Sequence, residues 1–168
     1  MNVLRAVVIV ALLGIAAYIG YRAFAPPAPV GSARTVAVYY VKPDGEALAK
    51  WSVSLSPKAI DRSSVALYAT AQVLAGPPTE TPAIRFPTGT VVRSARVSGA
   101  TATVDLGGSI VGPQDGSFGE SGEFKALVWT LTGLRGVDAV RVLVDGARVS
   151  TLPGGHLELD EPLTRQSF

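Results

Sequence analysis

Cysteine is absent from this 168-residue sequence, and His156 is its only histidine. The missing thiols exclude disulfides, a cysteine nucleophile, a lipid-modified cysteine and every metal site built on thiolates. A single histidine without companions cannot build a typical zinc site, because such a site takes several side-chain ligands. We therefore interpret His156 as a solvated loop residue, and we predict that the chain has no metal site and no bound cofactor.

An excess of basic charge is also missing from most of the chain. The formal net charge is +2, and Arg5, Arg22 and Arg34 all lie near the N-terminus. From Thr35 onward, 12 lysines and arginines face 13 aspartates and glutamates, so the net charge of this region is 12 − 13 = −1. Nucleic-acid binding depends on a strongly basic surface, and we predict that the chain binds no nucleic acid.

Common enzyme motifs are missing as well. Residues 119–123 read GESGE, which departs from the nucleophile elbow GxSxG at its final position, and a loop is expected where that elbow needs a strand. We interpret Ser121 as a helix cap, with Glu120 and Glu123 near the positive end of that helix. The glycines between residues 107 and 122 are not followed by the Gly-Lys-Ser/Thr of a phosphate-binding loop.

One acidic cluster could in principle perform acid–base chemistry or bind calcium. It consists of Glu158, Asp160 and Glu161 near the C-terminus. Its spacing fits no EF-hand loop, and no second carboxylate cluster accompanies it. We interpret the cluster as a solvated acidic tail. The sequence thus predicts no catalytic residue and a protein that is not an enzyme.

The N-terminus carries a charge-free apolar stretch, residues 6–21, which Arg5 and Arg22 flank. Its length approaches the roughly 20 residues that a bilayer span requires. We predict that residues 1–24 form an uncleaved signal anchor and that the proline-rich residues 25–34 form a stiff linker. A cleaved signal peptide is the alternative, because Ala23-Phe24-Ala25 resembles a cleavage site, although proline follows it directly.

Alternating and helical patterns predict short elements between residues 35 and 152. Their order is strand-strand-helix, strand-strand-helix, strand-strand, with strands at 35–41, 48–55, 91–97, 100–106, 139–144 and 147–152 and helices at 63–78 and 123–136. Asp145-Gly146 is typical of a two-residue hairpin turn. We predict an α+β fold in which two helices pack on one face of a mixed, largely antiparallel sheet.

The two predicted helices differ in how clearly they begin. Ser63 or Ser64 is expected to cap the first, whose apolar stripe contains Leu67, Ala71 and Leu74. The second follows residues 107–122, whose many glycines predict a long flexible loop. The apolar stripe of the second helix is predicted to consist of Phe124, Leu127, Val128, Leu131 and Leu134.

The predicted strands carry three further expectations. Strand 35–41 is apolar on both faces, which favours a central strand or one that a partner covers. Arg93 interrupts the alternation of its strand, which indicates a bulge or the end of a sheet. Trp51 and Trp129 fall on inward-facing positions, and we predict that both lie in the core.

Several short motifs recur in an order that resembles one family. They are Leu74-Ala75-Gly76-Pro77, Pro87-Thr88-Gly89-Thr90, Ala102-Thr103-Val104-Asp105-Leu106, Trp129-Thr130-Leu131-Thr132, Gly136-Val137-Asp138-Ala139-Val140, Leu143-Val144-Asp145-Gly146 and Pro162-Leu163-Thr164-Arg165. Their order and spacing resemble the GerMN domain, which is named for a sporulation and spore-germination protein. The resemblance covers residues 35–166.

The resemblance implies a bacterial envelope domain that an anchor or a lipid tethers to the membrane. Similar domains have the shape of ring-building modules in the extracytoplasmic space of spore-forming bacteria. Other members occur in bacteria that make no spores, so the resemblance does not imply sporulation here. It transfers no catalytic, cofactor-binding or metal-binding residue.

These inferences together predict a single-pass protein of the cell membrane with an extracytoplasmic C-terminal domain. We expect it to act without catalysis, by contact with an envelope protein or by self-association, through the face or edge of the sheet that the helices leave uncovered. The alternative is a peptidoglycan-binding module in which Tyr39, Tyr40 and Trp51 stack on sugars. A hydrolase that uses the acidic cluster is a third hypothesis.

Overall fold

The structure is a computed structural model that describes residues 34–56, 58–78, 80–111 and 116–168. The predicted anchor, residues 1–24, and all but the last residue of the predicted linker therefore lie outside the described residues. Within the described ranges, no helix is long and apolar enough to cross a membrane. Arg34–Phe168 forms one compact unit.

The described chain is α+β, as the sequence predicts. Its regular elements are β1 (Thr35–Val41), β2 (Leu48–Ser54), α2 (Arg62–Ala75), β3 (Thr90–Ser98), β4 (Thr101–Gly108), α3 (Gly116–Leu131) and β5 (Ala139–Val144), with short 3-10 turns η1 (Ser109–Val111) and η2 (Arg165–Ser167). The predicted hairpins β1–β2 and β3–β4 are confirmed, and both pairs are antiparallel. The predicted strand at 139–144 is confirmed as β5, which pairs in parallel with β4.

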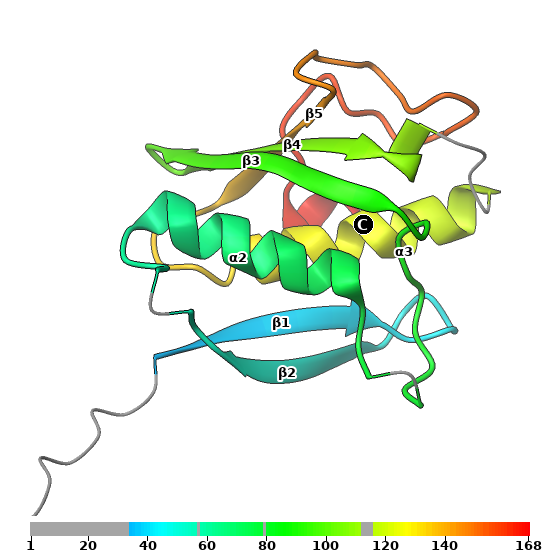
Figure 1. The fold of residues 1–168 in the computed structure, drawn as a ribbon. Helices are drawn as coiled ribbons and strands as arrows, with labels where there is room; N and C mark the ends of the chain where they lie inside the picture. The colour runs from blue at the N-terminus through cyan, green and yellow to red at the C-terminus, as the bar shows by residue number, and fades with distance from the viewer. Residues whose placement is uncertain (1–33, 57, 79, 112–115) are drawn as a thin grey trace, which may run out of the picture. The chain divides into compact units, whose positions relative to one another are not determined.

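The elements form three layers, which differs from the single sheet that we predicted. β1 and β2 make one two-stranded sheet, and β3, β4 and β5 make another. Figure 1 shows α2 and α3 between the two sheets, so the helices do not lie on one face of a common sheet. The physical reason lies at β1, where the backbone N–H of Tyr39 donates to the Thr130 hydroxyl of α3 at 2.9 Å. A helix side chain occupies the edge at which a third strand would pair.

Helix α3 is buried on almost every side. It begins at Gly116 and ends at Leu131, so residues 116–122 are helical and the predicted loop at 107–122 is wrong in this part. From Gly119 to Leu131, every residue is buried except Ser121, Lys125 and Trp129, which are half-buried. These three lie at intervals of four residues and form one narrow outer stripe. A helix with so little polar surface must be covered from both sides, as the two sheets do here.

Helix α2 begins at Arg62 and is capped by Asp61, not by Ser63 or Ser64. The Asp61 carboxylate accepts the backbone N–H groups of Ser63 and Ser64 at 2.8 and 2.9 Å. The hydroxyl of Ser64 in turn accepts the N–H of Asp61 at 3.0 Å, which completes a capping box. The helix ends at Ala75, three residues before the end of the predicted range, with Gly76 at its C-cap.

The buried side of α2 also differs from the predicted apolar stripe. Leu67 is 38% exposed, and Ala71 and Leu74 are only half-buried, so the predicted stripe is not the buried face. The buried positions are small or β-branched, namely Ala66, Ala69, Thr70 and Val73. Small side chains let α2 approach β1 and β3 closely on its two sides.

A β-bulge at Arg93 is confirmed, and it connects two strand ends. The register of β3 against β4 shifts between Val92 and Ser94. The Arg93 guanidinium contacts Asp105 at 3.4 Å and Asp145 at 2.8 Å. Asp145 and Gly146 have φ values of 49° and 81°, as the predicted two-residue turn after β5 requires.

The predicted final strand at 147–152 does not form. After the turn, Ala147 makes one isolated antiparallel bridge with Val144. The edge of β5 is instead covered by the C-terminal segment, since Val140 and Leu163 exchange backbone hydrogen bonds of 2.8 Å in both directions. The tail therefore closes the three-stranded sheet at β5.

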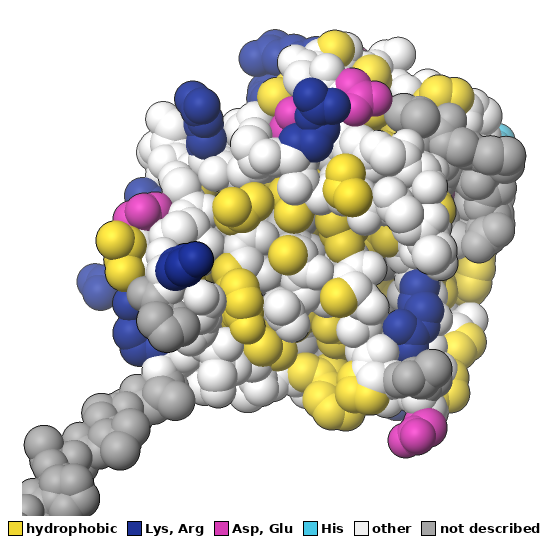
Figure 2. Space-filling view, in the orientation of Figure 1, with side chains coloured by type: hydrophobic (Ala, Val, Ile, Leu, Met, Phe, Trp, Pro, Cys, Tyr) yellow, Lys and Arg dark blue, Asp and Glu magenta, His cyan; other side chains and the backbone are white. Residues whose placement is uncertain are grey.

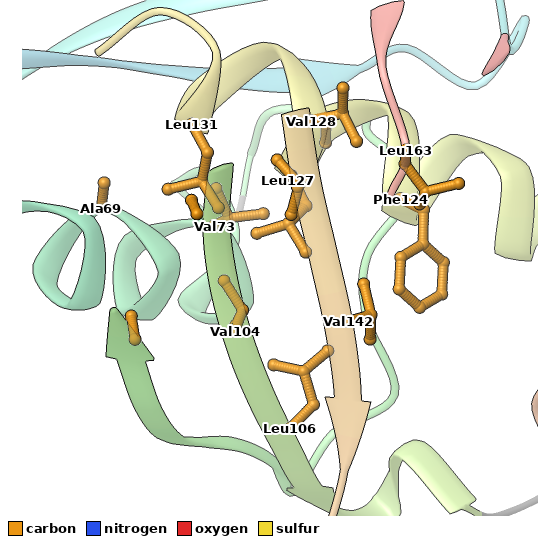
Figure 3. Packing of buried hydrophobic residues seen from close by; sticks show 14 of the residues in the cluster. Ala69, Val73, Val104, Leu106, Phe124, Leu127, Val128, Leu131, Val142 and Leu163 are labelled. Carbon is orange, nitrogen blue, oxygen red and sulfur yellow. The ribbon is translucent and has the colours of Figure 1, made fainter. Parts of the chain in front are cut away.

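The core lies between the three layers. Figure 3 shows Leu127 and Leu131 of α3 among Val104 of β4, Val142 of β5 and Val73 of α2. All five side chains are 3% exposed or less. Every residue of the buried apolar cluster falls between Val36 and Leu163. Residues 34–168 thus contain the whole of this core, and a fragment of that length is expected to fold independently.

We predict that Leu127→Ala lowers the free energy of unfolding of fragment 34–168 by about 2 to 5 kcal/mol, because it opens a cavity between the layers. The matched control is Leu67→Ala on the exposed side of α2, which should cost less than about 1 kcal/mol. Urea unfolding followed by circular dichroism measures both values. Equal losses in the two variants would contradict the layered arrangement.

Candidate functional site

The acidic cluster of the sequence lies in one open surface pocket. Glu158, Asp160 and Glu161 line it together with His156, and its volume is about 360 Å³. All four side chains are exposed to solvent. Among the described residues, no group of three or more histidine and carboxylate side chains is arranged to hold a metal ion. The pocket therefore presents solvated charges.

Ser121 is not a helix cap, because it lies inside α3, and its neighbours hold a feature that sequence reasoning missed. Glu120 and Glu123 were predicted to lie near the positive end of the helix, but α3 begins at Gly116 and both are inside it, each only 1% exposed. Glu120 Oε2 accepts the backbone N–H of His156 at 2.7 Å and that of Leu157 at 3.2 Å. A carboxylate on α3 therefore fixes the loop that leads to the acidic pocket.

The glycine before His156 permits this contact. A Cβ atom at Gly155 would collide with the carboxylate of Glu120. The Gly154-Gly155 pair in the sequence signalled a close approach of the backbone, but nothing in the sequence indicated which side chain approaches. The role of Glu120 is therefore to position the 155–157 loop.

The strongest candidate for a binding surface is the outer edge of β2. Hydrogen bonds at the two ends of the hairpin set the pairing, since Leu55 N donates to Arg34 O and Lys42 N donates to Ala47 O. Hydrogen-bonded and non-hydrogen-bonded pairs alternate along an antiparallel ladder. The N–H and C=O groups of Leu48, Lys50, Ser52 and Ser54 must then point away from β1.

The corresponding edge of β1 is obstructed at two points. Thr130 accepts from Tyr39 N at 2.9 Å, and Ile84 N donates to Val41 O at 2.9 Å. On β2, the hydroxyl of Tyr68 donates to Ser54 O at 2.9 Å. No hydrogen bond within the described part of the chain uses the outward groups of Leu48, Lys50 or Ser52. This stretch of β2 is an open strand edge.

Trp51 lies on β2 and contradicts its predicted place in the core. The side chain is 38% exposed, because β2 is the outer strand of a two-stranded sheet and the helices cover mainly β1.

Trp129 is half-buried at the outer stripe of α3, where Lys125 and Arg165 each lie 5.7 Å from the centre of its ring. The ring of Phe168 contacts it edge-on. Trp129 is therefore packed under charged side chains and is not a free surface.

The three aromatics that could bind sugars do not form one platform. Tyr40 is 5% exposed and its hydroxyl donates to Gln72 O at 2.9 Å, and burial raises the pKa of this tyrosine, against a smaller lowering by Arg85. Trp51 pairs with Val38, so it lies on the face opposite Tyr39. Only Trp51 offers an exposed ring on the inner side of the hairpin.

An apolar pocket of about 360 Å³ continues the β2 edge toward α2. Leu67, Tyr68 and Ala71 line it from the helix, and Ser56 and Ala59 line it from the segment after β2. Figure 2 shows hydrophobic side chains gathered over this face, with most charged side chains around its periphery. The open backbone edge, Trp51 and this pocket together make what we call the β2 surface.

Comparison with known families now identifies the domain. The sequence profile of the Germane family, described as sporulation and spore germination, matches residues 37–150. The chain belongs to the Germane family. The GerMN resemblance predicted from the sequence motifs is thereby confirmed, and the motif at 162–165 lies beyond the matched segment. No curated protein matches the sequence.

Solved structures share the fold of this Germane domain. The tandem GerMN domains of the sporulation protein GerM from Bacillus subtilis match with a TM-score of 0.63 at 21% identity, over 85% of this chain and 48% of that one. The first GerMN domain of the same protein gives 0.60 at 18% identity, over 79% and 98%. A candidate lipoprotein from Clostridium perfringens gives 0.56 at 17% identity, over 79% and 88%. The chain thus spans about half of the tandem structure.

We predict that Glu120→Ala destabilises the Germane domain by about 1 to 3 kcal/mol, because two backbone N–H groups of the 155–157 loop lose their acceptor. The matched control is Glu158→Ala, which removes an exposed carboxylate from the same loop and should change stability by less than about 0.5 kcal/mol. Urea midpoints measure stability, and hydrogen exchange at His156 and Leu157 measures loop protection. Unchanged exchange in Glu120→Ala would contradict the positioning role.

Proposed function

We propose that this Germane protein is a non-catalytic component of the bacterial cell envelope that binds a protein partner through the β2 surface. The observation that carries the proposal is the open edge of β2, where Leu48, Lys50 and Ser52 direct unpaired backbone groups outward. A partner that adds an extended strand would satisfy those groups. Each hydrogen bond would contribute about 0.5 to 1.5 kcal/mol.

Two side-chain features support a specific partner. Trp51 is partly exposed beside the open edge, and large aromatic side chains carry much of the binding energy in protein interfaces. Lys50 lies at the centre of the edge, and a lysine there disfavours indiscriminate pairing with apolar strands. The apolar pocket lined by Leu67 and Tyr68 could receive an apolar side chain of the partner.

Location in the envelope is the second part of the proposal. The apolar residues 6–21 favour a membrane anchor at 1–24, and the proline-rich residues 25–34 favour a spacer. In this topology the anchor crosses the membrane once and the Germane domain lies outside the cytoplasm. The similar fold of a candidate lipoprotein agrees with an envelope location.

A binding role rather than catalysis is the third part. The ionisable side chains that line the acidic pocket, His156 and the cluster at 158–161, are solvated. The buried Glu120 has a structural role, because its carboxylate accepts backbone N–H groups of the 155–157 loop. This buried carboxylate therefore stabilises the fold.

We predict that Ser52→Pro abolishes association of the domain and leaves its fold intact. Proline removes an N–H that points outward from an edge strand, where proline is tolerated. Ser52→Ala is the matched control, because it keeps that N–H and changes only the side chain. Light scattering of fragment 34–168 at high concentration measures self-association, and crosslinking of the full chain in membranes measures capture of an envelope protein.

Two results would contradict the proposed association. One is a wild-type fragment that stays monomeric at high concentration while the full chain crosslinks to nothing in membranes. The other is equal association of wild type and Ser52→Pro, which would move the interface away from the β2 edge. Circular dichroism of both Ser52 variants establishes that the fold is retained.

The exposure of Trp51 also favours one alternative, a peptidoglycan-binding module, because exposed aromatic rings stack on sugars. Co-sedimentation of fragment 34–168 with purified peptidoglycan separates the two functions. Glycan binding predicts that Trp51→Ala abolishes sedimentation and that Ser52→Pro has no effect. Strand pairing predicts no sedimentation with peptidoglycan in any variant.

A further inference from the structure

A third pocket lies at the end of the domain where β1 starts. Three arginines from distant parts of the chain, Arg34, Arg62 and Arg135, line it, and its volume is about 300 Å³. They come from the residue before β1, the first turn of α2 and the loop between α3 and β5. Figure 2 shows basic side chains gathered at this end of the domain.

The positive charge of this arginine pocket is not neutralised within the domain. Arg62 donates from one guanidinium nitrogen to the carbonyls of Gly99, at 2.9 Å, and Gly136. Arg34 donates to Ala59 O at 3.3 Å. These acceptors are neutral, so they orient the guanidiniums without compensating their charge. Among the described residues, ion pairs form only at Arg93, which lies outside the pocket.

Among the described residues that line the arginine pocket, Asp61 is the one acid, and its carboxylate caps α2. Its carboxylate caps the helix through the N–H groups of Ser63 and Ser64. The backbone N–H of Ser64, aided by that of Ser63, holds the pKa of Asp61 below its ordinary value, so the group is ionised at neutral pH. Three guanidiniums against this carboxylate leave a net charge of 3 − 1 = +2 in the pocket.

The walls of the arginine pocket are apolar. Val65, Leu134 and Val137 line it, and Ile60 stands beside them with 74% of its surface exposed. A pocket with guanidiniums and apolar walls suits a ligand that has an anionic head and an apolar body. Guanidinium groups bind phosphate oxygens through paired hydrogen bonds.

The position of Arg34 in the chain favours a lipid headgroup as the source of the phosphate. Arg34 is the last residue of the linker that follows the proposed anchor. The ten residues of this linker, 25–34, can span at most about 36 Å. Arg34 is therefore held within that distance of the end of the proposed anchor, and so within reach of the phosphate groups of lipid headgroups.

We propose that Arg34, Arg62 and Arg135 bind the phosphate of an anionic phospholipid headgroup and that Ile60 inserts among the headgroups beside it. This contact would orient the Germane domain on the membrane surface. The inference rests on the proposed membrane anchoring, and it assigns the arginine pocket to lipid while the β2 surface remains available for protein.

The test is co-sedimentation of fragment 34–168 with vesicles, because the fragment lacks the apolar N-terminus. Vesicles that contain phosphatidylglycerol should bind the fragment, and vesicles of pure phosphatidylcholine should not. The double variant Arg34→Gln/Arg135→Gln keeps Arg62 and its two carbonyl bonds. It should bind phosphatidylglycerol vesicles roughly 30-fold more weakly, from the loss of two charges near a membrane surface.

The matched control is Arg96→Gln/Arg148→Gln, which removes the same charge from exposed arginines outside the pocket. It should retain most of the binding, and urea midpoints should show that both double variants are folded. Equal weakening in the two double variants would overturn the pocket as the site. Binding of glycerol phosphate in solution as tightly as vesicles, or equal binding to both kinds of vesicle, would overturn the lipid assignment.

The results of vesicle binding, membrane fractionation and crosslinking distinguish a failure of the lipid contact from a failure of the proposed function. A fragment that ignores anionic vesicles, in a chain that still fractionates with membranes and still crosslinks through β2, would remove the lipid contact alone. A chain that does not fractionate with membranes would remove the proposed anchor.

Discussion

The structure depends on the burial of α3 between two sheets. From Gly119 to Leu131 this helix has no exposed residue, so the surrounding elements must pack against it on all sides. β1 covers one side and β5 the other. Even the half-buried outer stripe is covered, since Lys125 donates to the carbonyls of Gly45 and Glu46 in the β1–β2 turn. The C-terminal Phe168 closes the stripe against Trp129.

The same constraint explains the glycines in the first half of α3. Gly119 and Gly122 are buried, and a Cβ at Gly122 would collide with the side chain of Ile84. Glycine costs helix stability, which is why its abundance between 107 and 122 predicted a loop. Close packing against the segment before β3 outweighs that cost here. The error was thus a case in which tertiary contact overrides local propensity.

Sequence patterns predicted correctly those features in which residues close in the sequence are also close in space. The hairpins, the bulge at Arg93, the turn at Asp145-Gly146 and the family resemblance could all be read from residues close together in the chain. The three-layer order could not, because it depends on Thr130 reaching the edge of β1. The exposure of Trp51 follows from that order, and so was missed as well. The partnership of Glu120 with the 155–157 loop spans more than thirty residues, and in the sequence only the Gly154-Gly155 pair hints at it.

The two proposed binding surfaces are separate from the core of this domain. The interior contains buried carboxylates, of which Glu120 holds the 155–157 loop. The open edge of β2 and the arginine pocket next to Asp61 carry groups that folding leaves unsatisfied. A partner protein and an anionic surface could therefore be engaged without rearrangement of the core.

The contacts on the outer edge of β1 limit what the hairpin can build. Thr130 and Ile84 bond to that edge at Tyr39 and Val41, so a copy that adds its own β2 antiparallel to the first has only an obstructed edge left in the same sheet. Such an addition would be isologous and would end at a two-fold symmetric pair, with four strands in one continuous sheet. Growth into an open fibre through this hairpin would have to displace both contacts, so a larger assembly is expected to use a different surface.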